Sequence, residues 1–305
     1  MKPKFVFMGS PDISIPTLEA LITNYSVVGV VTQPDRPAGR GKTLNAPPVK
    51  LTAQMHDIPV IQPVRLKDAG VYEQLEEWLP DVIVVIAFGQ ILRQNVLDLP
   101  PFGCVNIHAS ILPRWRGAAP IQASILHGDE KTGVTIMRMD AGIDTGPILR
   151  KKEIPITPQD TTETLGKKLA NLGAELLLST LPEYLNGFIR PIPQPEEGAT
   201  YAKLIQKSDG HLDFSKSALI LERQIRAYNP WPGTSMALNG AILKVNKGEY
   251  IQGYQLTPGK RIVYQKFPAV GTMDGLIVLR EVQPPGKKNM PGDVFLRGYH
   301  YWENE

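Results

Sequence analysis

The chain has 305 residues, of which 42% are hydrophobic and 21% charged, and its 33 Lys and Arg against 30 Asp and Glu leave a net charge of +3. This length allows two folded domains, and the single cysteine, Cys104, excludes an intramolecular disulfide and a multi-cysteine zinc site. The basic excess lies in residues 207–305, with 13 Lys and Arg against 9 Asp and Glu. Such an asymmetry suits an anionic polymer partner, although ordinary domains also show it.

The N-terminal apolar run ends at Gly9 and is too short for the hydrophobic region of a signal peptide or for a membrane span. We therefore expect a soluble, cytoplasmic protein with no membrane contact.

The first half of the chain alternates predicted strands and helices. We expect strands at Lys4–Met8, Val27–Thr32, Asp81–Ala87 and Gly103–His108, and helices at Pro16–Ile22, Asp68–Trp78 and Pro120–Leu126, with Ser14 as a candidate N-cap. Val-rich continuous strands in this alternation are typical of a mainly parallel sheet covered on both faces, an α/β fold. Thr132–Met139 and Ile148–Ile156 are predicted to form a hairpin, and Thr161–Tyr184 a long helix.

Residues 33–50, QPDRPAGRGKTLNAPPVK, are predicted to form one long loop. It carries Arg36, Arg40, Lys42 and Lys50 against Asp35. Loops of this length in a compact domain are usually functional or disordered. A solvated loop and a loop that orders around a phosphate backbone both remain open at this point.

The composition changes at residues 186–200, NGFIRPIPQPEEGAT, where three prolines and two glycines predict a linker. Beyond it we expect a helix over Ser217–Ala227 and short strands at Ser235–Leu238, Ile242–Asn246, Arg261–Val263 and Leu276–Val282, a pattern that suggests a small β-barrel. We therefore divide the chain into a catalytic domain (1–189), a linker (190–206) and a C-terminal domain (207–305).

Asn106 and His108 lie two residues apart on a predicted strand, so both project from the face opposite Val105 and Ile107. An amide and an imidazole on one strand face form a catalytic pair, whereas a lone histidine is more often a core residue. Asp144, in the Gly-containing loop MDAGIDTGPI, is a candidate acidic partner, with an Asx turn as the equal alternative. Cys104 shares that strand face, but no role requires it.

The sequence gives little support for a dinucleotide-binding site or a metal site. Gly9 follows a predicted strand, as the first glycine of a dinucleotide-binding loop does. Such a loop needs three glycines, and this segment has one, so it does not support dinucleotide binding. The remaining histidines lack metal-ligand spacing, so we expect no metal site.

These segments resemble a known family. The stretches FMGSPDISIPTL, VTQPDRPAGRGK, AFGQIL, NIHASILPRWRGAAPIQ, TGVTIMRMDAGIDTGPIL, KSDGHLDFS and QIRAYNPWPGT are similar, in order and spacing, to the methionyl-tRNA formyltransferase family. The part with Asn106, His108 and Asp144 is shared more widely by enzymes that use 10-formyltetrahydrofolate. The loop with Arg40 and the segment Asn229–Gly233 favour aminoacylated tRNA as the acceptor. Departures are mild: Ile111 stands where Leu is usual and Ser10 where Thr is common.

The resemblance implies a Rossmann-like formyltransferase domain joined to an OB-like β-barrel that binds tRNA. It implies formyl transfer from 10-formyltetrahydrofolate, a cosubstrate, to the α-amino group of methionyl initiator tRNA, by a protein expected to be a monomer. Asn106 would stabilise the oxyanion, His108 would carry a proton, and Asp144 would support His108. The folate site would comprise Ser110, Ile111, Leu112, Pro113, Phe88, Gly89 and Ile91, and the tRNA contacts Arg36, Arg40 and Lys42.

Three alternatives stay open from the sequence. One is a formyltransferase that acts on an amino-sugar nucleotide, the second is a tRNA-binding protein with an inactive formyltransferase fold, and the third is a folate-dependent hydrolase that releases formate.

Overall fold

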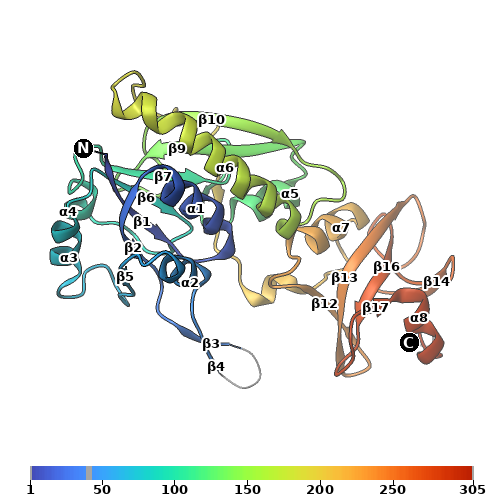
Figure 1. The fold of residues 1–305 in the computed structure, drawn as a ribbon. Helices are drawn as coiled ribbons and strands as arrows, with labels where there is room; N and C mark the ends of the chain where they lie inside the picture. The colour runs from blue at the N-terminus through green and yellow to red at the C-terminus, as the bar shows by residue number, and fades with distance from the viewer. Residues whose placement is uncertain (1, 39–42, 304–305) are drawn as a thin grey trace. The chain divides into compact units, whose positions relative to one another are not determined.

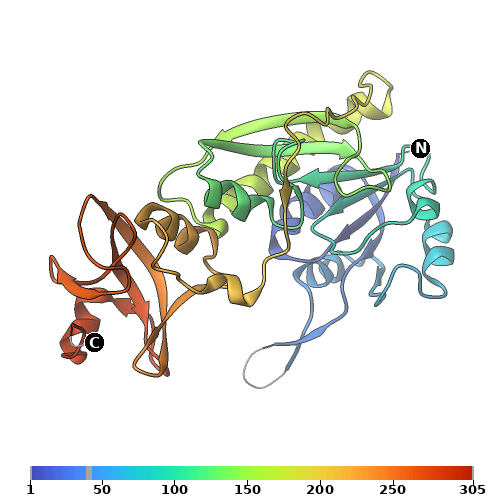
Figure 2. The ribbon, with the colours of Figure 1, turned by 180° about the vertical axis from the view of Figure 1, so that it is seen from behind.

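The computed structural model describes residues 2–38 and 43–303, so the expectations for Arg40 and Lys42 lie outside the described residues. The chain forms two compact units, drawn in Figures 1 and 2. The first unit comprises Met1–Pro120, Lys131–Pro155 and Gly166–Ala202, and the second comprises Ile121–Glu130, Ile156–Leu165 and Lys203–Glu305. Most of the segment that the composition predicts to be a linker is therefore folded into the first unit.

A seven-stranded mixed sheet forms the centre of the first unit, in the order β10-β9-β7-β6-β1-β2-β5. Neighbouring strands from β7 to β5 are parallel, while β9 runs antiparallel to both β7 and β10. This confirms the predicted α/β class, the parallel strands and the hairpin. The strands span Lys4–Gly9 (β1), Ser26–Val31 (β2), Val60–Ile61 (β5), Val82–Ile86 (β6), Cys104–His108 (β7), Lys131–Arg138 (β9) and Ile148–Pro155 (β10).

Helices cover this sheet, as its continuous apolar strands predict. Helices α1 and α6 lie in front of the strands in Figure 1, and the strands lie in front of these helices in Figure 2. On the other face, Leu75 of α3 and Val96 of α4 join a core cluster with Met8 and Cys104. The helices of the first unit span Ile15–Asn24 (α1), Pro48–Met55 (α2), Val71–Trp78 (α3), Gln94–Leu97 (α4) and, from Gly166 onward, Thr162–Leu185 (α6). Helix α5 (Pro120–His127) falls almost wholly in the second unit.

The structure differs from the sequence predictions at three places. Ser14 occupies the N-cap position of α1 as predicted, but its side chain makes no capping hydrogen bond: a 3-10 turn over Asp12–Ser14 precedes the helix, and the Ser14 hydroxyl donates to the Ile86 carbonyl at 3.1 Å. The helix expected from Asp68 begins at Val71. Residues 33–50 are not one loop, because β3 (Arg36–Ala38) pairs antiparallel with β4 (Thr43–Asn45) and α2 begins at Pro48.

The second unit is built on an antiparallel sheet in the order β12-β13-β16-β15-β14, with β17 beside β16. Helix α7 (Ala218–Ala227) begins where predicted, and the hydroxyl of Ser217 accepts the Ile220 amide at its N-terminus. The sequence did not predict β15 and α8, and β13 is longer than expected. These elements span Thr234–Leu238 (β12), Ala241–Gln252 (β13), Arg261–Tyr264 (β14), Phe267–Gly271 (β15), Gly275–Gln283 (β16), Met290–Pro291 (β17), Gly292–Gly298 (α8) and Lys207–Gly210 (a 3-10 turn).

Within residues 2–38 and 43–303, no helix combines the length and the apolar character needed to cross a bilayer.

Candidate active site

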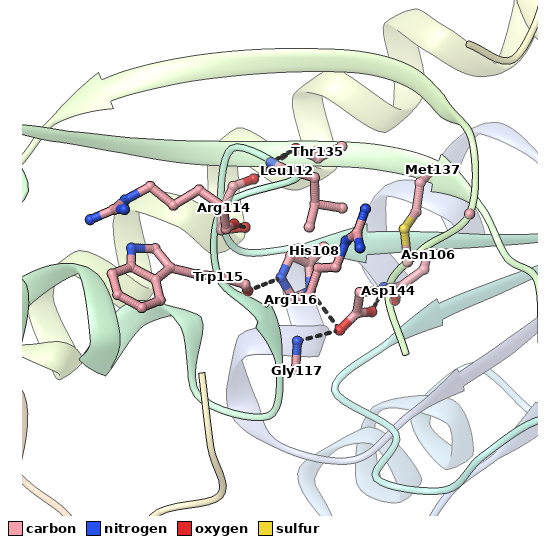
Figure 3. Close-up of polar contacts among 12 residues, drawn as sticks. Asn106, His108, Leu112, Arg114, Trp115, Arg116, Gly117, Thr135, Met137 and Asp144 are labelled. Atoms are coloured by element: carbon pink, nitrogen blue, oxygen red, sulfur yellow. Dashed lines mark hydrogen bonds and ion pairs between the residues drawn. The ribbon is translucent and has the colours of Figure 1, made fainter. Parts of the chain in front are cut away.

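Asn106, His108 and Asp144 come together at the carboxyl end of β7 (Figure 3). Strand alternation directs both β7 side chains to one face, and the loop between β9 and β10 brings in the carboxylate. Asn106 Nδ2 lies 3.3 Å from Asp144 Oδ1, and His108 Nδ1 lies 3.6 Å from Asp144 Oδ2. Asn106 and His108 are 8% and 5% exposed. The Asp144 side chain is 17% exposed. A buried amide donor and a buried imidazole thus meet a partly exposed carboxylate.

The hydrogen bonds of Asp144 favour an acidic partner of His108 over an Asx turn. The Asx-type contacts in the loop belong to Asp140, whose Oδ1 accepts the Gly142 amide at 3.0 Å and the Thr145 hydroxyl at 2.7 Å. The Asp144 carboxylate instead accepts the Gly117 amide at 2.8 Å and faces β7. Asp144 has φ of 53°, a left-handed conformation that is uncommon for residues other than glycine. The loop geometry therefore directs this carboxylate into the site.

The Trp115 carbonyl determines which nitrogen of His108 carries a proton. His108 Nε2 lies 2.8 Å from this oxygen. A carbonyl oxygen only accepts hydrogen bonds, so Nε2 is the protonated nitrogen. In the neutral ring, the lone pair of Nδ1 then faces Asp144.

The loop after β7 is held by buried polar contacts. The Thr135 hydroxyl donates to the Ser110 carbonyl at 2.7 Å and accepts the Leu112 amide at 3.1 Å. Lys151 Nζ donates to the Leu112 carbonyl at 3.0 Å. Leu112 is fully buried beside Met137, and Ser110, also fully buried, donates to the Arg114 carbonyl at 2.6 Å. Of the four loop residues predicted to bind folate, Ile111 and Pro113 are partly exposed, while Ser110 and Leu112 support the loop from inside.

The segment after β6 holds the other residues of the predicted folate site. Phe88 is 2% exposed and belongs to the core, whereas Ile91 is 75% exposed. Gly89 has φ of 78°, and a Cβ there would meet no atom closer than 3.9 Å. Gln33 Nε2 donates to the Phe88 carbonyl at 3.0 Å, and its Oε1 accepts Arg36 Nη2 at 3.0 Å. Arg36, an exposed residue predicted to contact tRNA, is thus linked to the backbone beside Gly89.

Asp35 is the acidic residue of that neighbouring segment. Its carboxylate accepts Gln62 Nε2 at 2.7 Å and Lys50 Nζ at 2.8 Å. These hydrogen bonds, that of Gln62 first, hold the pKa of Asp35 below its ordinary value. Lys50 therefore forms an ion pair with Asp35, and its charge is already balanced within the protein.

The sequence reasoning missed the residues that brace the site from the segment 192–202. The short strands β11 (Tyr201–Ala202) and β8 (Arg116–Gly117) pair in parallel. Arg116, with a fully buried side chain, donates to Gln194 Oε1 at 3.1 Å and to both carboxylate oxygens of Glu196 at 3.3 Å. A proline-rich composition predicts a linker whether or not it packs on a domain, so the composition gave no sign of these contacts.

In the part of the chain that the structure describes, neither the single cysteine nor any cluster of metal-binding side chains adds to this site. Cys104 is 1% exposed, and burial raises the pKa of its thiol to about 12, so it stays protonated. Among residues 2–38 and 43–303, no group of three or more His, Cys, Asp or Glu side chains is arranged to hold a metal ion.

Comparison with known proteins shows which family this chain resembles. Residues 4–181 match the family described as formyl transferase, and residues 204–300 match the formyl transferase C-terminal domain. The chain is 47% identical over 301 residues to methionyl-tRNA formyltransferase of Myxococcus xanthus (98% of this chain, 96% of that protein) and 48% identical over 300 residues to that of Bacillus pumilus (97% and 94%).

Solved structures share the fold at lower identity. An N-formyltransferase of Helicobacter canadensis, solved with folinic acid and dTDP-3-aminofucose, superposes with a TM-score of 0.66 at 19% identity, covering 92% of this chain and 99% of that one.

Proposed function

Because this chain belongs to the methionyl-tRNA formyltransferase family of enzymes, we propose that it transfers the formyl group of 10-formyltetrahydrofolate to the α-amino group of methionyl initiator tRNA. The observation that carries this proposal is the convergence of Asn106, His108 and Asp144 at the end of β7. The identity to methionyl-tRNA formyltransferases over nearly the whole chain supports tRNA, and not an amino-sugar nucleotide, as the acceptor.

In the proposed reaction the neutral amine attacks the formyl carbon and forms a tetrahedral intermediate with a negatively charged oxygen. Asn106 Nδ2 carries two hydrogens, of which one is directed to Asp144. The second is available for the oxyanion. The α-amino group, with an ordinary pKa near 7.7–8.0, needs little help to become neutral at physiological pH.

Collapse of the intermediate breaks the bond between the formyl carbon and N10 of the folate, and the proton lost by the amine ends on N10. We assign this transfer to His108 Nδ1, because Nε2 is engaged by the Trp115 carbonyl. Asp144, 3.6 Å from Nδ1, would favour the protonated ring while the proton is in transit.

For the folate we propose a site between the loop 110–113 and the segment 88–91. Ile111, Pro113, Gly89 and Ile91 would contact the cosubstrate, while Ser110, Leu112 and Phe88 would shape the backbone beneath them. The folinic acid in the Helicobacter canadensis neighbour supports a ligand of this class. No metal is needed for the reaction.

We propose that tRNA contacts Arg36, Arg40, Lys42 and the basic C-terminal region, mainly through phosphates. The proposed division is a catalytic domain (1–189), a linker (190–206) and an OB-like barrel (207–305). The antiparallel sheet of the second unit supports the barrel, and the linker is one whose residues up to Ala202 pack on the first unit. We also propose that the protein acts as a cytoplasmic monomer.

The experiment supplies 10-formyltetrahydrofolate with charged initiator tRNA, charged elongator tRNA, free methionine or an amino-sugar nucleotide. We expect formylation of the initiator tRNA and a steep fall in acceptor use as salt rises, because phosphate contacts are screened. Labelling of free methionine or of the sugar at a comparable rate would overturn the assignment. Release of formate without acceptor would indicate a hydrolase, and no reaction would indicate an inactive fold.

A further inference from the structure

The segment Ile192–Ala202, here called the strap, contacts two loops of the active site. One loop carries Asp144, and the other follows β7 and carries Trp115. The first residue of the strap exchanges two backbone hydrogen bonds with Ile148, of 2.7 and 2.9 Å. Its last residues pair with β8, where Arg116 N donates to the Thr200 carbonyl at 2.9 Å. Gly117 has φ of 107°, and a Cβ at this position would lie 2.7 Å from the Ala202 carbonyl. The strap is thus a hydrogen-bonded part of the first unit.

Gln194 of the strap fastens the loop of Asp144. Its Nε2 donates to the carbonyls of Asp144 and Gly146, at 2.8 and 2.7 Å, and its Oε1 accepts Arg116 Nε at 3.1 Å. Both amide hydrogens are therefore used on one short stretch of backbone. Asp144 has a left-handed conformation, with φ of 53°, which residues with a Cβ adopt only occasionally, and the contacts from Gln194 hold the backbone in it.

Thr200 of the strap binds the loop that carries Trp115. Its hydroxyl oxygen accepts the Trp115 amide at 2.9 Å. Trp115 is also left-handed, with φ of 62°, and its carbonyl is the acceptor for His108 Nε2. The orientation of the His108 ring therefore depends on backbone that Thr200 helps to hold.

We propose that Gln194 and Thr200 are positioning residues for formyl transfer. Gln194 holds the Asp144 carboxylate in place, and Thr200, through Trp115, holds the His108 ring. Together they maintain the 3.6 Å separation of Nδ1 and Oδ2, one through each residue of the pair. This inference rests on the catalytic roles proposed above for His108 and Asp144.

The test compares near-isosteric substitutions in the full-length enzyme. Gln194→Glu and Gln194→Met keep the side-chain length but remove the two N–H donors. Thr200→Val keeps the shape but removes the acceptor, and Thr200→Ser restores the acceptor. Glu197→Gln, at an exposed position of the same strap, is the matched control.

We expect both Gln194 variants and Thr200→Val to lower kcat by about 10- to 100-fold, because small misplacements of reacting groups have effects of this size. KM for tRNA and folate should change by less than about threefold, since positioning acts on the bound complex. Thr200→Ser and Glu197→Gln should retain kcat near that of the wild type. In ¹⁵N spectra of the imidazole, the protonated Nε2 of His108 should persist in Thr200→Ser and lose its single-tautomer signature in Thr200→Val.

Melting temperatures and near-ultraviolet circular dichroism show which variants are folded, and the Gln194→Met variant replaces Gln194→Glu if the added charge unfolds the protein. Wild-type kcat in the folded Gln194 variants and in Thr200→Val would overturn the inference, as would failure of Thr200→Ser to restore kcat. His108→Ala and Asp144→Ala separate the two proposals. If the wild type does not formylate the tRNA, the proposed function fails. If His108→Ala and Asp144→Ala leave formylation intact, the catalytic roles of these two residues fail, and the positioning role that rests on them fails too. If they abolish it while the strap variants are fully active, the positioning role alone fails.

Discussion

Asn106 Nδ2 donates to Asp144 Oδ1 over 3.3 Å, across 38 residues of sequence. One hydrogen of the amide is used in this contact, which fixes the plane of the amide group and directs the other hydrogen into the site. The same carboxylate accepts the Gly117 amide through its second oxygen. Asp144 is therefore a common acceptor for a strand and a loop that approach it from different parts of the chain.

Substitution of Asn106 tests the oxyanion role. We expect Asn106→Ala to lower kcat by about 10²- to 10³-fold with little change in KM, because the lost donor acts on charge that develops in the transition state. Steady-state formylation kinetics with varied tRNA and varied folate measure both parameters. Asn24→Ala, at an exposed helix end, is the control, and an Asn106→Ala loss confined to KM would contradict the assignment.

Thr135→Val should destabilise the first unit. The buried hydroxyl is donor to the Ser110 carbonyl and acceptor for the Leu112 amide, and its removal leaves two buried backbone groups unpaired at about 1–3 kcal/mol for each unsatisfied group. Urea unfolding monitored by fluorescence measures the change. Thr135→Ser keeps the hydroxyl and should have a free energy of unfolding close to that of the wild type. Equal losses in Thr135→Ser and Thr135→Val would contradict the role of the hydroxyl.

Substitution of Arg116 should lower the free energy of unfolding more than substitution of Glu196, although the two residues form one ion pair of 3.3 Å. Burial lowers the pKa of Arg116, but hydrogen bonds with Tyr201 and Glu196 outweigh it and leave this pKa above its ordinary value. Its side chain is 1% exposed and that of Glu196 is 80% exposed. We expect Arg116→Met to cost about 1–3 kcal/mol, because Gln194 Oε1 loses its donor. Glu196→Gln should cost less than about 1 kcal/mol.

Thermal unfolding of the two single variants and the wild type checks this inequality. A larger loss in Glu196→Gln than in Arg116→Met would mean that the ion pair, and not the buried contacts of Arg116, stabilises the loop.

Cys104 should resist thiol reagents in the folded protein. Its Sγ lies 3.5 Å from the Val96 carbonyl, and burial raises its pKa from 9.0 to about 12. At pH 8 we expect a thiol-reactive dye to label the native enzyme far more slowly than the enzyme in guanidinium chloride. Rapid stoichiometric labelling without denaturant would contradict the burial.

The same shift has a consequence for stability. Because the folded-state pKa is raised, the stabilising contribution of the protonated thiol is complete below about pH 9 and is lost as the pH rises toward 12. The free energy of unfolding of wild type should therefore fall more steeply over this range than that of Cys104→Ala.

The sequence alone determined the features that depend on local periodicity. Continuous apolar runs predicted β1, β2, β6 and β7. The two-residue spacing of Asn106 and His108 placed both on one face of a strand, because side-chain direction in a strand repeats every second residue. The tertiary structure decided the contacts between distant segments. Thr200 meets Trp115 across 85 residues and Gln194 meets Asp144 across 50, although the composition of residues 186–200 predicts only a linker. No local pattern encodes such pairings, since they depend on which backbone groups the folded sheet leaves available to the strap.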